Sequence, residues 1–274
     1  MTPRHKRLAL YLEELYERCN RRELVSPDPL QFLYRYEAPE DREIAALVAS
    51  SLAYGRVATI LKSVGAVLEA LGPSPRAAVE RYGEEHWRDV FASFRHRFTD
   101  GADVAALLGG ARRVVSRWGS LGGRLLSARR ECGSLTGALD SLVAELENGR
   151  PSSLLSRPQR GSACKRHFLM LRWLVRRDEV DPGGWSGLDP AELIVPLDTH
   201  MYAVCRSLRF TRRKAADLKT ALEATRAFAR LSPCDPTRYD FVLTRFGIRA
   251  DMEQEALLAE CRARSTTERI VTEC

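Results

Sequence analysis

Long apolar runs are missing from this sequence. No stretch approaches the roughly 20 apolar residues of a membrane span, and the charged first 19 residues lack the apolar core of a signal peptide. The 274 residues are 45% hydrophobic and 29% charged, a balance typical of a folded globular protein. We therefore expect a cytoplasmic protein without a membrane partner.

Paired cysteines are missing as well. The seven cysteines are widely scattered and include no CxxC, which indicates neither a disulfide framework nor a zinc site. An iron–sulfur cluster is not expected, because Cys234, Cys261 and Cys274 are too far apart for a compact ligand loop. The sequence predicts reduced thiols and no cofactor.

Lysine is scarce, although the chain is basic. Only five of the 43 basic residues are lysines, while the net charge is +7 and the pI is about 9.2. A basic protein favours a polyanionic partner such as nucleic acid. Arginine cannot act as an amine nucleophile, so a lysine retained in such a composition is a candidate for amine chemistry. One of the five, Lys165, lies inside a motif.

Glycine and proline breaks divide a sequence that has a helical pattern along most of its length. Apolar residues recur at helical spacing over residues 4–20, from Ile44 to Gly55, over 57–71 and in short stretches between 74 and 150. A charged helix with a frayed end is expected over residues 251–274. The pattern predicts an all-α fold.

The second and third of these helices meet at the corner Ala53-Tyr54-Gly55-Arg56. Tyr54 can be a packing residue beside a solvated Arg56, or the corner can be a DNA-facing turn that enters a base stack. The sequence leaves both interpretations open.

A short predicted helix over 152–160 ends near Pro158, Gly161 turns the chain, and Cys164 to Arg176 is strongly helical. This order predicts a helix-hairpin-helix over about residues 152–176. The exposed amides of such a turn and the positive end of the helix dipole suit a phosphate group.

Lys165 opens the second helix of this hairpin, and Asp198 follows 33 residues later in Pro196-Leu-Asp-Thr-His200. If the two side chains meet, they form an amine nucleophile with a carboxylate partner. Asp198 can also be the N-cap of the next helix, and the two roles are compatible. The spacing requires residues 178–197 to fold back along the chain.

Three segments carry a resemblance to a known family: GSACK ending at Lys165, PLDTHMYAVCRSL carrying Asp198, and Ser50–Arg56. Together they resemble the helix-hairpin-helix (HhH-GPD) DNA glycosylase superfamily. The long spacer between lysine and aspartate is more like that of archaeal 8-oxoguanine DNA glycosylases. Four longer blocks are most similar to an uncharacterised bacterial family related to those enzymes: DREIAALVASSLAYGRV, GSACKRHFLMLRWLVRRD, LIVPLDTH and DPTRYDFVLTRFGI. The matches span roughly residues 28–248, but the turn lacks the usual second glycine.

The resemblance implies a two-domain glycosylase fold with a DNA-binding cleft. Residues 42–180 would form a helical barrel domain, and residues 1–41 with 181–274 a second domain. Lys165 would form a Schiff base at C1′ of a flipped nucleotide, assisted by Asp198, in a base-excision glycosylase/AP lyase. The base pocket would include Phe168, Arg172 and Asp240, although Phe168 as core and Asp240 as a helix cap or arginine partner are open alternatives.

The same resemblance implies DNA carrying a damaged base, foremost 8-oxoguanine, as the partner of a monomer associated with the nucleoid. It implies no iron–sulfur cluster, and a monovalent cation bound by the hairpin is in doubt without the second glycine. DNA contacts are expected from Tyr54, Arg56, Arg160, Gly161, Ser162, Cys164 and Arg166. The alternatives are a non-catalytic helix-hairpin-helix DNA-binding protein and a structural or protein-interaction bundle.

Overall fold

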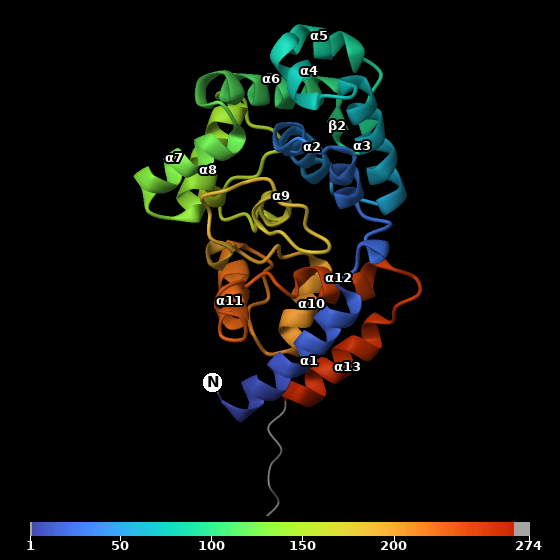
Figure 1. Ribbon diagram of the computed structural model, residues 1–274, viewed down its shortest axis with the longest axis vertical. Helices are drawn as coiled ribbons and strands as arrows, with labels where there is room; N and C mark the ends of the chain where they lie inside the picture. The colour runs from blue at the N-terminus through green and yellow to red at the C-terminus, as the bar shows by residue number, and fades with distance from the viewer. Residues whose placement is uncertain (1, 266–274) are drawn as a thin grey trace, which may run out of the picture.

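The computed structural model describes residues 2–265, and the chain within them is mostly α-helical (Figure 1). The first half contains α1 (Pro3–Cys19), α2 (Pro39–Ser51), α3 (Val57–Leu71), α4 (Pro75–Arg81), α5 (Glu84–Val90), β1 (Arg95–His96), β2 (Thr99–Asp100), α6 (Gly101–Trp118), α7 (Leu121–Cys132) and α8 (Leu135–Glu147). The second half contains α9 (Lys165–Val175), α10 (Thr199–Ser207), α11 (Leu218–Ala229), α12 (Asp240–Ile248) and α13 (Gln254–Ser265). Short 3-10 helices cover Arg22–Leu24, Pro29–Arg35, Pro158–Arg160 and Pro190–Glu192.

The mostly helical character predicted from the sequence is confirmed, and the helix ends have local causes. Ser120 and Ser134 cap α7 and α8 by accepting backbone amides in the first turn. Gly133 ends α7 with a φ of 66°, which glycine adopts without a steric penalty. The predicted helix after residue 251 is present as α13, whereas the frayed end expected for residues 266–274 lies outside the described residues.

The helices gather into two groups with α9 between them (Figure 1). Helices α2 to α8 form one group; α1 and α10 to α13 form the other, in which the first and last described helices contact each other. The 3-10 helix Pro29–Arg35 packs against α2 and α3, so the segment before residue 42 is shared between the groups. One continuous set of buried side chains runs through both groups.

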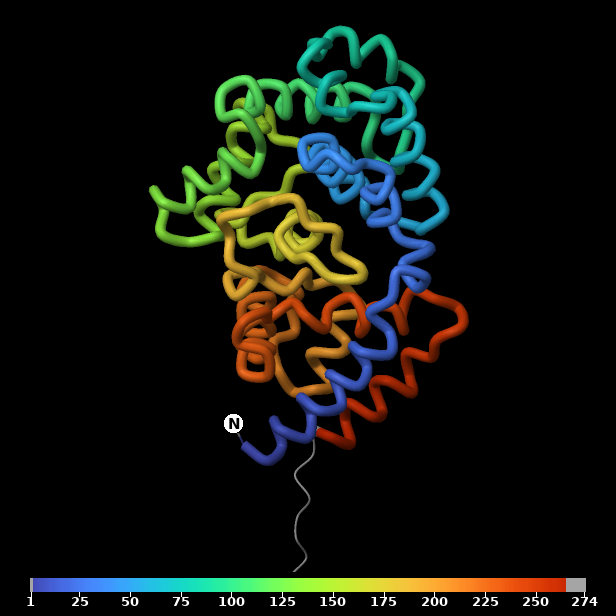
Figure 2. The backbone as a smooth tube through the Cα atoms, in the orientation of Figure 1, coloured from blue at the N-terminus to red at the C-terminus, as the bar shows by residue number. Residues whose placement is uncertain are grey.

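The connection from α9 to α10 folds back over α9, as the spacing of Lys165 and Asp198 requires (Figure 2). The amides of Gly183 and Trp185 donate to the carbonyls of Trp173 and Leu174 at 3.0 and 2.8 Å. The indole of Trp185 donates to Glu43 of α2 at 2.7 Å. These bonds turn the chain back at the end of α9 and hold the returning segment on it.

A buried ionic network joins α9 to this connection and to α12. The guanidinium of Arg172 donates to Asp181 at 3.1 and 3.2 Å and also to Asp240. Arg176, one turn later, donates to Asp181 and Asp178. Arg172, Arg176 and Asp181 are 3%, 4% and 0% exposed, so the network lies in the interior.

Burial and the neighbouring carboxylates have opposite effects on the pKa values of the two arginines. Burial lowers the pKa of Arg172, but the charges of Asp181 and Asp240 raise it above the ordinary value. Burial likewise lowers the pKa of Arg176, and the charges of Asp181 and Asp235 raise it above the ordinary value. Both arginines therefore remain charged and join α9 to α12 and to the segment before it.

Among residues 2–265, no single helix is long and apolar enough to cross a membrane, although α3 and α4 together reach that length with a bend of 63° between them. Nor does this part of the chain contain a group of three or more His, Cys, Asp or Glu side chains placed to hold a metal ion.

Candidate functional site

The segment before the hairpin turn is less helical than its sequence predicts. Only Pro158–Arg160 forms a helix, and it is a single 3-10 turn. Pro158 has no amide to donate, and the carboxylate of Asp140 on α8 accepts from Gln159 N at 3.1 Å and from Arg157 Nε at 3.3 Å. Bonds to Asp140 replace helical bonds here, so the predicted first helix over 152–160 is wrong.

Two left-handed residues form the turn that follows. Gly161 has a φ of 75°, and Cys164 has a φ of 48°. Cys164 is 1% exposed, and its thiol donates to the carbonyl of Ser156 at 3.5 Å. Burial raises the pKa of this thiol, which favours the protonated form that donates. A buried cysteine thus adopts a left-handed conformation in a turn that has a single glycine.

The turn presents Lys165 as the first residue of α9. The N-cap residue Cys164 makes no side-chain cap, so the first amides of α9 have no capping partner on that residue. The carbonyl of Gly161 accepts from Leu218 N at 3.1 Å, which fixes the turn to the start of α11. The start of α9 is therefore rigidly placed and able to accept an anion.

Lys165 and Asp198 meet in the structure. Lys165 Nζ lies 3.8 Å from Asp198 Oδ2, and the two side chains are 31% and 16% exposed. Asp198 Oδ1 accepts from Met201 N at 2.7 Å and so caps α10. One oxygen of the carboxylate fixes its position, and the other faces the amine.

The pair lies on the wall of a cavity of about 670 Å³. The hairpin turn 161–166 forms one side, and the Ala53–Gly55 corner forms another. Leu169 and Trp173 of α9 also line it, at four and eight residues after Lys165. The volume falls in the range of small-molecule and nucleobase-sized sites.

Phe168, Arg172 and Asp240 do not lie on this wall. Phe168 is 1% exposed and belongs to the core, while Arg172 and Asp240 are each 3% exposed and bind each other in the buried network. Burial raises the pKa of Asp240 to about 6, against the opposing effect of Arg172. The prediction that these three side chains face the pocket is wrong. The residues four and eight positions after Lys165 line the cavity, whereas Phe168 and Arg172, three and seven positions after it, do not.

The residues expected to contact DNA differ in their exposure and in their hydrogen bonds within the protein. Arg56 and Arg160 are exposed, as is Gly161, and Ser162 is half-buried. Arg166 instead donates to the carbonyls of Ser51 and Ser153 at 2.8 and 2.5 Å.

Tyr54 is held in place by the neighbouring β-hairpin. Its hydroxyl donates to the carbonyl of His96 at 2.9 Å and shares a 2.7 Å hydrogen bond with the hydroxyl of Thr99. The guanidinium of Arg166 lies 5.2 Å from the centre of its ring. These contacts favour the interpretation of Tyr54 as a packing residue.

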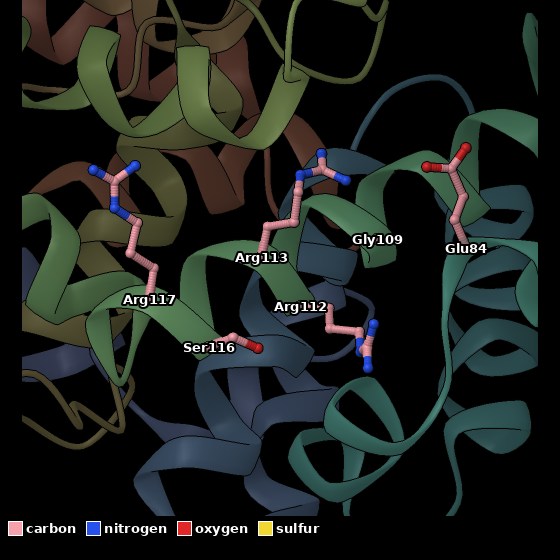
Figure 3. Close-up of a pocket in the computed structure, with 6 residues that line it drawn as sticks. All are labelled: Glu84, Gly109, Arg112, Arg113, Ser116 and Arg117. Carbon is pink, nitrogen blue, oxygen red and sulfur yellow. The ribbon is translucent and has the colours of Figure 1, made fainter.

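A second depression, of about 510 Å³, lies along α6 and shares no lining residue with the Lys165 cavity (Figure 3). Arg112, Arg113 and Arg117 are its basic residues. Arg112 donates to the carbonyl of Glu80 at 3.2 Å, Arg113 to that of Leu146 at 3.1 Å, and Arg117 lies 3.6 Å from Glu145. Each arginine there has a partner within the protein.

The fold and the site define a mostly helical protein with a lysine–aspartate pair presented by a hairpin. The chain belongs to the family described as protein of unknown function (DUF2400), whose family model matches residues 28–249. This range contains Lys165, Asp198 and the Tyr54 corner. Comparison with curated proteins and with solved structures gave no match.

Proposed function

We propose that this protein is a base-excision DNA glycosylase with AP lyase activity, in which Lys165 is the nucleophile and Asp198 its partner. The observation that carries the proposal is the 3.8 Å approach of Lys165 Nζ to Asp198 Oδ2 on the wall of the 670 Å³ cavity. An amine beside a fixed carboxylate, open to a cavity, is the arrangement that covalent amine catalysis needs.

The reaction begins when the neutral amine of Lys165 attacks C1′ of a nucleotide whose base lies in the cavity. The N-glycosidic bond breaks, and the base leaves with its electron pair and takes up a proton. Asp198 Oδ2 stabilises the positive charge on the sugar and accepts the proton released by Lys165. The sugar ring then opens to give a protonated Schiff base, and loss of a proton from C2′ expels the 3′ phosphate.

DNA binding in this proposal uses the hairpin and the basic surface. The first amides of α9 face a phosphate near the damaged nucleotide, and Arg56 and Arg160 contact the neighbouring backbone. The two groups of helices would act as two domains on either side of the bound DNA. The enzyme removes the base from the stack at a cost of a few kcal/mol, which damage reduces.

The base most consistent with the resemblance to archaeal enzymes is 8-oxoguanine. In the cavity, the half-buried Leu169 offers apolar surface to a flat base, while Trp173 lines the wall with a side chain that is only 1% exposed. Phe168, Arg172 and Asp240 have no part in base recognition in this proposal, because they are buried and do not line the cavity.

Borohydride trapping tests this function. The protein is incubated with a panel of duplexes and single strands, each carrying one lesion, in the presence of borohydride. We expect a covalent protein–DNA adduct with at least one lesion, foremost 8-oxoguanine, and none with Lys165→Gln. The control is Lys62→Gln, since Lys62 is an exposed lysine on α3. An undiminished adduct in Lys165→Gln would remove Lys165 from the mechanism.

The same experiment separates catalysis from binding alone. Salt-dependent DNA binding with no released base and no adduct across the panel would identify a non-catalytic DNA-binding protein. No DNA affinity near physiological salt would indicate a structural or protein-interaction bundle.

A further inference from the structure

The small β-hairpin presents an aromatic side chain to solvent. Strands β1 and β2 pair antiparallel, with Arg95 opposite Asp100 and His96 opposite Thr99, so the turn consists of Arg97 and Phe98 alone. Phe98 is 80% exposed, the highest value among the large hydrophobic side chains exposed in residues 2–265. Single exposed apolar residues are common, so its significance depends on its setting.

The base of the hairpin is rigid. His96 and Thr99 are both 0% exposed. The ring of His96 is hydrogen-bonded to Ser63 Oγ at 2.9 Å and to the carbonyl of Tyr54 at 3.1 Å. Asp100 forms the capping box of α6 with Asp103. These contacts fix the position of the tip relative to α3 and α6.

Arg97, in the turn, lies against a residue that lines the Lys165 cavity. Tyr54, which holds the hairpin, and Gly55 both line that cavity. A Cβ atom added to Gly55 would lie 2.7 Å from Arg97 Cδ, so the Arg97 side chain covers the glycine. The Arg97 guanidinium lies 5.4 Å from the centre of the Phe98 ring. Arg97 therefore connects the cavity rim to Phe98.

The turn is strained, and its surroundings are basic. Arg97 has a φ of 55°, a conformation that favours glycine. Arg56, Arg95 and Arg97 are all exposed, and Arg95 is 3.4 Å from Asp100. An exposed aromatic ring beside an arginine suits a base stack flanked by phosphates better than it suits an apolar protein surface.

We propose that the Arg97–Phe98 turn is a wedge for duplex DNA. Phe98 enters the base stack at the position left by the nucleotide that occupies the Lys165 cavity, and Arg97 and Arg56 contact the flanking phosphates. Tyr54 does not fill the gap, because its hydroxyl is bound to the hairpin. This inference rests on the proposed function in its choice of partner, duplex DNA, but not on the chemistry at Lys165.

The test uses three probes: a duplex with a tetrahydrofuran abasic-site analogue, the same duplex with the base intact, and the single strand. We expect the wild-type protein to bind the abasic duplex most tightly. Phe98→Ala should reduce that preference by about 10-fold, because stacking of an aromatic ring on a base has about that effect, and should leave single-strand binding within about 2-fold. Phe98→Trp should restore the preference, and Leu10→Ala, which removes another exposed apolar side chain, should leave it unchanged.

Each outcome separates the wedge from the catalytic proposal. An adduct at Lys165 together with an unchanged preference in Phe98→Ala would overturn the wedge and leave the catalytic function standing. Loss of the preference in Phe98→Ala with no adduct on any lesion would support the wedge and overturn the chemistry. Wild-type protein that does not distinguish the two duplexes, or a Phe98→Ala variant that loses single-strand binding equally, would also overturn the wedge.

Discussion

Helix α9 carries two cation–carboxylate contacts that differ in burial and in hydrogen bonding. At its first residue, Lys165 lies 3.8 Å from Asp198, and both side chains are open to a cavity. Two turns later, Arg172 is 3% exposed and donates hydrogen bonds to both Asp181 and Asp240. The same helix thus holds an accessible pair and an enclosed pair.

The difference indicates separate roles for the two pairs. A buried pair with several hydrogen bonds destabilises the fold strongly when one partner is lost, because a charge is left without compensation. A half-exposed pair at 3.8 Å adds little to stability, since water screens it. We therefore expect substitutions at Arg172 to change the free energy of unfolding and substitutions at Lys165 to change activity.

The largest expected effect is that of Lys165→Arg. Arginine retains the positive charge beside Asp198 but cannot lose a proton to become a nucleophile. Base release and adduct formation should fall by about 10⁴-fold or more, as for other removed nucleophiles. The free energy of unfolding should stay within about 0.5 kcal/mol of wild type. Single-turnover kinetics and urea unfolding measure both; retained excision would mean that the charge of Lys165 suffices.

The reciprocal exchange, Arg172→Lys, should act on stability. A lysine ammonium does not reproduce the planar fork that reaches Asp181 and Asp240. We expect the free energy of unfolding to fall by about 3 kcal/mol, with the activity per folded molecule close to wild type. The matched control is Arg112→Lys on the exposed face of α6. A normal unfolding midpoint with lost excision would contradict the assigned roles.

Asp198→Asn divides the two functions of one carboxylate. Asparagine caps a helix about as well as aspartate, so the stability of α10 should be retained. The loss of charge beside Lys165 should lower the excision rate by about 100-fold. Asp198→Ala should show the same loss of activity and, in addition, a fall of about 1 kcal/mol in unfolding free energy. Wild-type activity in Asp198→Asn would leave Asp198 as a cap only.

The smallest expected effect concerns His167, which shares α9 with both pairs but is buried without a counter-ion. Burial lowers its pKa from the ordinary 6.5 to about 3, and Arg166 acts in the same direction. Its stabilising effect is complete above pH 6.5 and is lost as the pH falls toward 3, because the unfolded state binds the proton first. At pH 5 the loss is about 2 kcal/mol.

Urea unfolding of wild type and His167→Gln at pH 7 and pH 5 measures this difference. The variant should lose about 2 kcal/mol less than wild type between the two pH values. Burial also lowers the pKa of His96, but that histidine is present in both proteins and its effect cancels. Equal losses in the two proteins would show that His167 takes up a proton without a cost to the fold.

The sequence predicted the helices because helix formation depends largely on local rules. Apolar spacing, proline and glycine breaks, and N-cap residues set the helix ends. The meeting of Lys165 and Asp198 was a hypothesis that required residues 178–197 to fold back, and the structure shows that reversal. The failed prediction, a helix over 152–160, had a tertiary cause: the carboxylate of Asp140, which lies on another helix, accepts the hydrogen bonds of this segment.

The sequence by itself determined a mostly helical chain with one lysine at the start of a hairpin helix. Tertiary structure decided which face of α9 meets the cavity. Residues three and four positions after Lys165 both lie near it on the helix surface, so the sequence alone does not show which of them is covered by neighbouring elements. Tertiary structure buried Arg172 and Asp240 in the ionic network and placed Leu169 and Trp173 on the cavity wall. It also placed the Arg97–Phe98 turn beside Gly55 of the cavity lining, through hydrogen bonds from Tyr54 that join residues more than 40 positions apart.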